Sequence, residues 1–341
     1  MSNLTRASQE LFKRSPDERF TSLEELTQHC RDEKRASQDR WHLPQQVRLQ
    51  GLQDLIGVAL GSDGDFQLND WSFGQLCKLA GVGKDTVNRL SPDTASQVLA
   101  ETLPGGRKPL QVLTREDRVR SIHGASYTRL HNADLLQVIR ETATDFTPPQ
   151  VGFNGGTGLY CGEQDMFAFL IDPTGWIEIE GEAFAPGFFV WNSEVGRRSL
   201  GLQTFWFQAV CQNHIVWDAI EVLDFSRKHT ANVHDALLDI RRGIDDLVAK
   251  RDARRDQFAV AIGNAMKERL GDDADEVMKK LAEHGISRSL AKQATELAAS
   301  QGRFTIFSLV DALTKLTGKA QWIGDRTDAD QKAGSLLALA L

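Results

Sequence analysis

Apolar residues recur at helical spacing in two separate parts of the chain. In residues 71–103 they lie on one helical face, which Gly81 interrupts, and Ser91-Pro92 opens a further helix because serine caps a helix and proline is tolerated at its first position. From His229 onward they are spaced by four and three, which is typical of packed helices. The pattern therefore predicts helices over 71–103 and a helical region over 229–341.

Two arginines, Arg251 and Arg254, occupy positions of the C-terminal region where this spacing predicts apolar residues. Such an interruption indicates a bend, a salt-bridged layer or a site for an anion. The last residues, 336–341, are too apolar to lie in solvent, so we expect them to pack on their own domain or on a neighbouring subunit.

The apolar period between residues 108 and 217 is that of strands. Residues 166–171 form a continuous apolar run, which suits a buried strand, whereas Trp176–Glu180 alternates and predicts one face toward water. A capped helix over 132–142 interrupts the strands. We therefore expect the α+β class, with a mainly antiparallel central sheet over about 108–217 flanked by helices, and a C-terminal helical region.

Composition divides the chain into three regions. Residues 1–45 are polar and charge-dense, which indicates an N-terminal arm with one helix. Residues 46–228 hold the predicted α+β core domain, and residues 229–341 hold the helical C-terminal region. A length of 341 residues suits two domains, or one large domain with a helical extension.

Composition also narrows the class of protein. No apolar run approaches the roughly 18 residues of a membrane-spanning helix, and the N-terminus has no apolar signal core, so we expect a cytoplasmic protein with no membrane partner. The four cysteines are scattered without a CxxC pair, which argues against a disulfide framework and a zinc cluster.

The charge of the chain is uneven. A net charge of −7 argues against a dedicated nucleic-acid binder, but residues 104–131 hold six cationic side chains and two carboxylates, a local balance of +4. Arginines on strands beside aromatic rings can follow a single nucleic-acid strand, although a solvated sheet face over an aromatic core gives the same pattern. The candidate nucleic-acid-binding residues are Arg107, Lys108, Arg115, Arg118, Arg120, Tyr127 and Arg129, with Arg197 and Arg198 as a second group.

Residues 73–90 fit the helix-turn-helix template. Small Cys77 lies at the expected helix crossing, and Gly81 lies in the turn, where a positive φ is needed. The side chains that the second helix would present to base edges or phosphates are Lys84, Asp85, Thr86, Asn88 and Arg89. Any packed helix corner meets the same template, so DNA contact and plain packing both stay open.

No constellation of catalytic or metal-binding residues stands out. Gly83-Lys84 lacks the glycine that a phosphate-binding loop needs five residues earlier, since position 78 is a lysine. Cys211 and His214 have no orienting acid, and His123 and His131 have no ligand partners at suitable spacing. We therefore expect no catalytic residue, no metal and no cofactor, and favour a protein that is not an enzyme.

Several short motifs resemble one protein family. The turn Asn192-Ser193-Glu194-Val195-Gly196 is followed by Val210-Cys211, and Val119-Arg120 stands upstream. In order and spacing these motifs resemble a phage/plasmid-like family with a domain of unknown function, found in phages, prophages and plasmids. The chain departs from the family pattern after Cys211, where Gln212 and His214 stand. The resemblance implies that the gene belongs to a phage, a prophage or a plasmid, and it implies no activity.

The resemblance and the local positive charge together suggest a function. Phages and plasmids commonly carry recombination proteins that coat and anneal single strands with a basic sheet groove, a helical C-terminal region and a ring or filament assembly. By this analogy we expect a single-stranded DNA-binding protein that anneals or protects strands in recombination or replication, as a homo-oligomer in the host cell cytoplasm.

Two alternatives stay open. The first is a non-enzymatic interaction protein that blocks or redirects a host factor, such as a defence component, which the acidic balance and the helical C-terminal region favour. The second is an enzyme that acts on nucleic acid. It would need a metal or acid–base cluster, which the sequence does not show.

Overall fold

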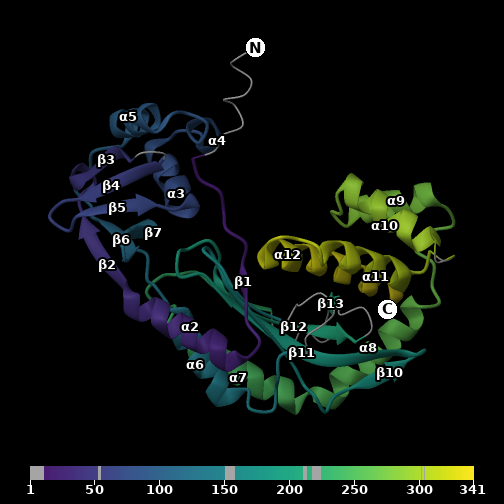
Figure 1. Cartoon of the computed structure of the whole chain (residues 1–341). Helices are drawn as coiled ribbons and strands as arrows, with labels where there is room; N and C mark the ends of the chain where they lie inside the picture. Colours follow the sequence, from purple (N-terminus) through teal and green to yellow (C-terminus); the bar gives the residue numbers. More distant parts are fainter. Residues whose placement is uncertain are drawn as a thin grey trace.

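The molecule contains two sheets built from different parts of the chain, one beside α3–α5 (residues 70–102) and the other between α7 (Ala236–Ala249) and α12 (Ile323–Gly334) (Figure 1). The computed structural model describes residues 11–52, 55–149, 158–209, 213–216, 224–300, 302 and 304–341. The fold belongs to the α+β class, with mainly antiparallel sheets, flanking helices and a C-terminal helical region, as the apolar pattern predicts.

The six-stranded sheet combines the N-terminal strands with the arginine-rich hairpin. Its strands are antiparallel to their neighbours except for one parallel pair, residues 65–68 with 118–124. In spatial order they are β2 (Ser37–His42), β6 (Leu110–Arg115), β7 (Arg118–Gly124), β5 (Asp65–Leu68), β4 (Leu55–Leu60) and β3 (Val47–Leu52). The helical elements of this part are η1 (Pro44–Gln46), α3 (Asp70–Ala80), α4 (Lys84–Val87) and α5 (Pro92–Thr102).

Local sequence sets both ends of α3. The side-chain oxygen of Asn69 accepts a hydrogen bond from the backbone N–H of Ser72 at 2.8 Å, which caps the start of the helix. Gly81 ends the helix with a φ of 68°, in the left-handed region that favours glycine. The predicted break at Gly81 is confirmed.

The second sheet is antiparallel throughout. Its main path runs β1 (Glu18–Arg19), β8 (Leu159–Cys161), β9 (Met166–Ile171), β11 (Glu182–Asn192), β12 (Leu200–Gln208) and β13 (Asn213–Ile215). Two short strands add to it: β10 (Ile177–Ile179) pairs with β11, and β14 (Asp224–Arg227) pairs with β12.

Both faces of this sheet are buried along β9. Met166 and Leu170 face a core shared with three helices, whereas Phe167 and Phe169 face an aromatic core on the other side. The prediction of a buried strand over 166–171 is confirmed, because successive side chains of a strand alternate between its faces and both faces are covered. The helices on the first face are α2 (Leu23–Ala36), α6 (Asn132–Thr142) and α7 (Ala236–Ala249).

The C-terminal helices pack against the second sheet through aromatic and aliphatic contacts. Trp206 of β12 stacks on Phe258 with ring centroids 3.8 Å apart. Leu336, Leu337 and Ala340 of the apolar tail are buried in the same core, whereas Leu339 and Leu341 are exposed, so the tail packs on its own chain only in part. These elements are α8 (Arg251–Ala265), α9 (Ala274–Glu283), α10 (Arg288–Ser300), α11 (Ile306–Thr317), α12 (Ile323–Gly334) and η2 (Ser335–Ala340).

The arginines that interrupt the C-terminal apolar spacing mark a bend. α7 ends at Ala249 and α8 begins at Arg251, whose guanidinium lies 2.6 Å from Asp172. A break in the helix and an ion pair therefore occur at the same place. None of the helices within the described ranges is long and apolar enough to cross a membrane.

The single sheet expected over residues 108–217 is divided in the structure. β6 and β7 pair with strands from residues 37–68, while residues 159–208 supply most of the second sheet. Part of the predicted polar arm, residues 1–45, forms β1, α2 and β2, and so contributes to both sheets. These N-terminal strands carry charged residues on short segments, so their apolar alternation is weak.

Candidate functional site

The turn between β11 and β12, residues 192–196, is a buried connection between the two sheets. The side-chain amide of Asn192 donates a hydrogen bond to the backbone oxygen of Leu130 at 2.9 Å. Gly196 has a φ of 74°, which favours glycine, and packs closely against the His123 ring. The motif that stands out in the sequence therefore joins the β11–β12 hairpin to the six-stranded sheet.

Glu194 is the charged centre of this turn. Its Oε2 lies 2.9 Å from a guanidinium nitrogen of Arg120, and its Oε1 accepts a hydrogen bond from the backbone N–H of Asn132 at 2.8 Å. Nδ1 of His131 lies 3.4 Å from the same carboxylate. Burial alone would raise the pKa of Glu194, but Arg120, His131 and Asn132 together lower it to about 2. Glu194 is therefore ionised at neutral pH.

Carboxylates pair with three arginines of the predicted binding surface, Arg115, Arg120 and Arg129. Arg120 also lies 3.2 Å from Glu33 of α2, which pairs with Arg115 as well. Arg129 lies 2.7 Å from Asp39 of β2. Arg120 and Arg129 are buried, and their charges are compensated inside the molecule. Each of these three arginines has a carboxylate partner inside the molecule, and a phosphate would have to compete with that partner.

Tyr127 belongs to the same connection. Its ring stacks on His123 with centroids 3.7 Å apart and on His229 at 5.3 Å, and its hydroxyl donates to the backbone oxygen of Glu194 at 2.9 Å. Burial lowers the pKa of His123 and of His229 to about 4, so both imidazoles are neutral at pH 7. The ring predicted to stack on a base is engaged in protein contacts.

The two arginines after the turn have different surroundings. Arg198 lies 3.1 Å from Asp165 and 2.8 Å from Asp328, which ties the turn to α12. Arg197 is exposed, and its guanidinium carbon lies 5.8 Å from the centre of the Trp71 ring. Of this second group, Arg197 alone is open to an external anion.

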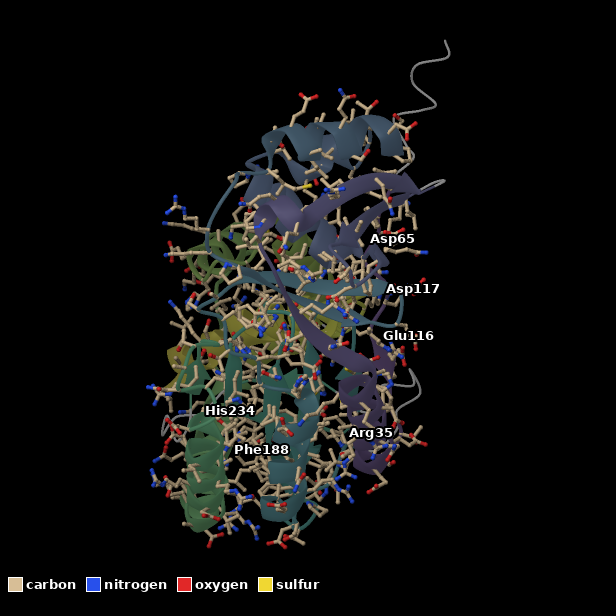
Figure 2. The ribbon with its side chains drawn as sticks, turned by 90° about the vertical axis from the view of Figure 1, so that its left-hand side faces the viewer. Arg35, Asp65, Glu116, Asp117, Phe188 and His234 are labelled. Carbon is tan, nitrogen blue, oxygen red and sulfur yellow. The ribbon has the colours of Figure 1, made fainter. Side chains whose placement is uncertain are left out.

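Four of the nine predicted residues are thus exposed cations. Within the ranges that the structure describes, no carboxylate lies at ion-pair distance from them. Arg118 begins β7, directly after the acidic turn of Glu116 and Asp117, which lies along one edge of the molecule with Asp65 (Figure 2). The exposed cations are Arg107, Lys108, Arg118 and Arg197.

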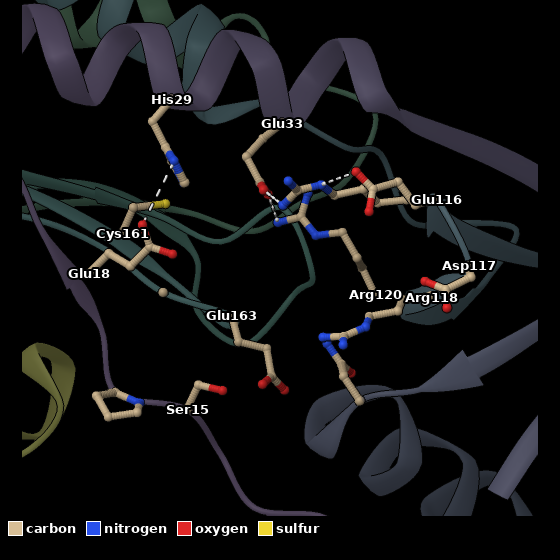
Figure 3. Close-up of a pocket in the computed structure, with 14 residues that line it drawn as sticks. Ser15, Glu18, His29, Glu33, Glu116, Asp117, Arg118, Arg120, Cys161 and Glu163 are labelled. Atoms are coloured by element: carbon tan, nitrogen blue, oxygen red, sulfur yellow. Dashed lines mark ion pairs between the residues drawn. The ribbon is translucent and has the colours of Figure 1, made fainter. Parts of the chain in front are cut away.

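A polar pocket of about 450 Å³ lies where α2, β8 and the β6–β7 hairpin meet (Figure 3). Three predicted arginines, Arg115, Arg118 and Arg120, line it, but carboxylates outnumber them. One of these carboxylates, Glu163, accepts a hydrogen bond from the backbone N–H of Trp71 at 3.1 Å, and burial raises its pKa. The pocket therefore offers both positive and negative groups to a ligand.

No protein-family model, curated protein or solved structure matches the chain. The resemblance to the phage/plasmid-like family stays a prediction from short motifs. Its Val210-Cys211 element, and with it Cys211, lies outside the described residues.

The other candidate chemistry of the sequence is used for packing. The second helix of the predicted helix-turn-helix, α4, has four residues, and its Lys84 donates to Asp70 of α3 at 2.8 Å. This segment is a packed helix corner. His214 is buried and stacks on Phe169 at 4.2 Å. Among the described residues, no group of histidine, cysteine and acidic side chains could hold a metal ion.

The side chains at the far end of the pocket carry no signal in the sequence. His29 of α2 and Cys161 of β8 both line it, next to Glu18 of β1. They lie far apart in the sequence and share no motif, so no local signal reveals them. The carboxylate partners of the arginines are missed for the same reason, except Glu194, which lies in the conspicuous turn.

Proposed function

We propose that this protein is a phage- or plasmid-encoded single-stranded DNA-binding protein that anneals or protects strands, and that its exposed cations contact the phosphates. One observation carries the proposal: Arg107, Lys108, Arg118 and Arg197 are exposed, and no carboxylate in the described part of the chain pairs with them. An exposed cation that pairs with no carboxylate keeps its full attraction for phosphate. Trp71 adds an aromatic ring beside Arg197.

The other predicted residues have a supporting role in this proposal. Arg115, Arg120, Arg129 and Arg198 are held by carboxylates, and Tyr127 by a histidine stack. Among them, Arg120 of β7 pairs with Glu194 and so fixes the β6–β7 hairpin relative to the β11–β12 turn. The exposed cations on those elements thereby keep a constant spacing along a bound strand.

The salt dependence of binding tests the proposal. On a single strand each neutralised phosphate contributes about 0.7 to the slope of log affinity against log salt, so four contacts give a slope of about 3 and a loss of roughly 50-fold between 50 and 200 mM salt. Gel shifts with single-stranded oligonucleotides at these two salt concentrations measure it. Absence of a shift at micromolar protein in low salt refutes the proposal.

A set of variants assigns the contacts. Replacing the four exposed cations by alanine together should abolish the shift and the salt slope, whereas Lys292→Ala should leave both unchanged. Lys292 is a suitable control because its side chain is 73% exposed and lies on α10, outside both sheets. Light scattering with and without oligonucleotide tests the homo-oligomer that belongs to this proposal.

A second candidate function is the binding of a host protein, which the edge of the six-stranded sheet favours. β2 is the outermost strand there, and Trp41 and Leu43 at its end are 51% and 36% exposed. An open edge strand with apolar side chains can accept a strand from a partner. A pull-down from nuclease-treated host lysate should retain a protein on the wild type and lose it with Trp41→Lys. Equal retention by both proteins contradicts this candidate.

A further inference from the structure

A second pocket, with a volume of about 690 Å³, lies among the C-terminal helices and shares no lining residue with the polar pocket. Its walls come from the turn after α8, the end of α10 and the start of α11. These three helices lie together on the C-terminal side of the molecule (Figure 1). The volume is within the range of small-molecule sites.

Backbone hydrogen bonds join two of these walls, the turn after α8 and the start of α11. The N–H of Leu270 donates to the backbone oxygen of Phe304 at 2.8 Å, and the N–H of Ile306 donates to that of Glu268 at 2.9 Å. Arg269 lies between these bonds in an isolated antiparallel bridge. Arg269 and Phe304, which both line the pocket, are therefore held at a fixed spacing.

One part of the pocket lining is apolar. Met266 and Phe304 line the pocket, and both pack against the buried core of the C-terminal helices. Ala299, near the end of α10, adds a small apolar side chain. A thioether and an aromatic ring offer an adaptable apolar surface, and an aliphatic chain gains free energy when such a surface removes it from water. This part of the lining therefore favours an apolar group of a ligand.

The charged part of the lining is positive. Lys267 and Arg269 line the pocket, and no carboxylate does so among the residues that the structure describes. Both cations have acidic partners outside the lining: Lys267 lies 3.8 Å from Glu180, and Arg269 lies 3.4 Å from Asp272 and donates to its backbone oxygen at 3.0 Å. All four side chains are more than half exposed, so these ion pairs contribute little and a ligand anion can replace either acid.

We propose that this pocket binds a small amphipathic anion, an aliphatic chain that carries a carboxylate at one end. The apolar lining holds the chain, and Lys267 and Arg269 hold the carboxylate. A guanidinium can bind a carboxylate with two parallel hydrogen bonds, so Arg269 exchanges the carboxylate of Asp272 for that of the ligand. This site is separate from the proposed DNA contacts, because none of the four exposed cations assigned to phosphate lines it.

Equilibrium dialysis of the full chain against radiolabelled decanoate tests the proposal. We expect a single site with a dissociation constant on the order of 0.1 mM, which is typical of a ligand of this size. Each buried CH₂ should tighten binding by roughly 4-fold, so octanoate, which is shorter by two, should bind about 15-fold more weakly. Absence of decanoate binding at millimolar concentration overturns the proposal, as does equal binding of the two chain lengths.

Two competitors separate the contributions of the chain and of the charge. Decyltrimethylammonium has the same chain with a positive head group, which Lys267 and Arg269 repel, so it should not displace decanoate. Acetate has the carboxylate without the chain and should not displace decanoate at equal concentration. Displacement by the ammonium compound as efficient as by unlabelled decanoate contradicts the role of the two cations. The same result with acetate contradicts the role of the apolar lining.

Variants place the ligand in this pocket, with thermal unfolding to show that each variant is folded. Arg269→Ala should weaken decanoate binding by roughly 10-fold or more, because a charge-assisted hydrogen bond is lost. Ala299→Trp introduces a large ring at an exposed position of the lining and should block the site. Arg288→Ala is the matched control, since Arg288 is exposed on α10 and does not line the pocket. If Ala299→Trp binds decanoate as tightly as the wild type, or if Arg288→Ala weakens binding as much as Arg269→Ala, the proposal is wrong.

Discussion

Replacing Glu194 by glutamine removes the negative charge at the centre of the β11–β12 turn and keeps the shape of the side chain. Glutamine can still accept the hydrogen bond from the backbone N–H of Asn132, which is 2.8 Å away in the wild type. It cannot form the ion pair with Arg120, whose guanidinium is buried. We expect the variant to fold less stably because one carboxylate partner of a buried cation is lost.

The magnitude follows from the pKa of Glu194. Its fall from 4.5 to about 2 corresponds to about 3 kcal/mol of stability at neutral pH. The folded-state pKa is lowered, so this contribution is present above pH 4.5 and is lost as the pH falls through about 2. The difference between wild type and variant should therefore be about 3 kcal/mol at pH 7 and about 1 kcal/mol at pH 3.

Urea unfolding at pH 7 and pH 3 measures both values. Glu296→Gln is the matched control, since Glu296 is exposed on α10 and its ion pair with Lys292 at 3.9 Å should contribute less than about 1 kcal/mol. A loss below about 1 kcal/mol at pH 7, or a loss that is the same at both pH values, would refute the role given to Glu194.

Three further changes test the packing around the sheets. Gly196→Ala places a Cβ 2.5 Å from the His123 ring at a φ of 74°, so thermal unfolding should show a loss of about 1–3 kcal/mol. Trp206→Ala removes the stack on Phe258 and should lower the free energy of unfolding in urea by about 3–5 kcal/mol, with proteolysis of the C-terminal helices as a second readout. Burial raises the pKa of Asp330 from 3.8 to about 6, so its contribution to stability is full below pH 3.8 and is lost as the pH rises through about 6. Asp330→Asn should remove this pH-dependent loss of stability. If the melting temperature of the variant falls between pH 5 and pH 7 by as much as that of the wild type, the role given to Asp330 is wrong.

Much of the secondary structure could be predicted from local patterns. The helices of residues 71–103, the buried strand of 166–171 and the C-terminal helical region all have a clear apolar period, and the structure confirms them. The break at Gly81 follows from one residue whose backbone tolerates a positive φ. The N-terminal strands were not predicted, because short charged segments become strands only when a partner strand lies beside them.

The sequence predicts that the candidate site residues lie on strands and turns. It does not predict which side chains surround each of them. Arg120 meets Glu194 across 74 residues of chain, and Arg129 meets Asp39 across 90. A sum of charges along the sequence counts these arginines as free, since it contains no information on which carboxylate each one meets.

The sequence by itself determined the α+β class, the main helices and the conspicuous turn, because apolar period and glycine conformation act over a few neighbouring residues. Tertiary structure alone decided that the strands form two sheets, that the turn joins them, and which predicted cations stay exposed. It also brought His29 and Cys161 to the lining of one pocket. Ion pairs and pockets depend on distances of a few ångströms between residues far apart in the chain, and only packing sets those distances.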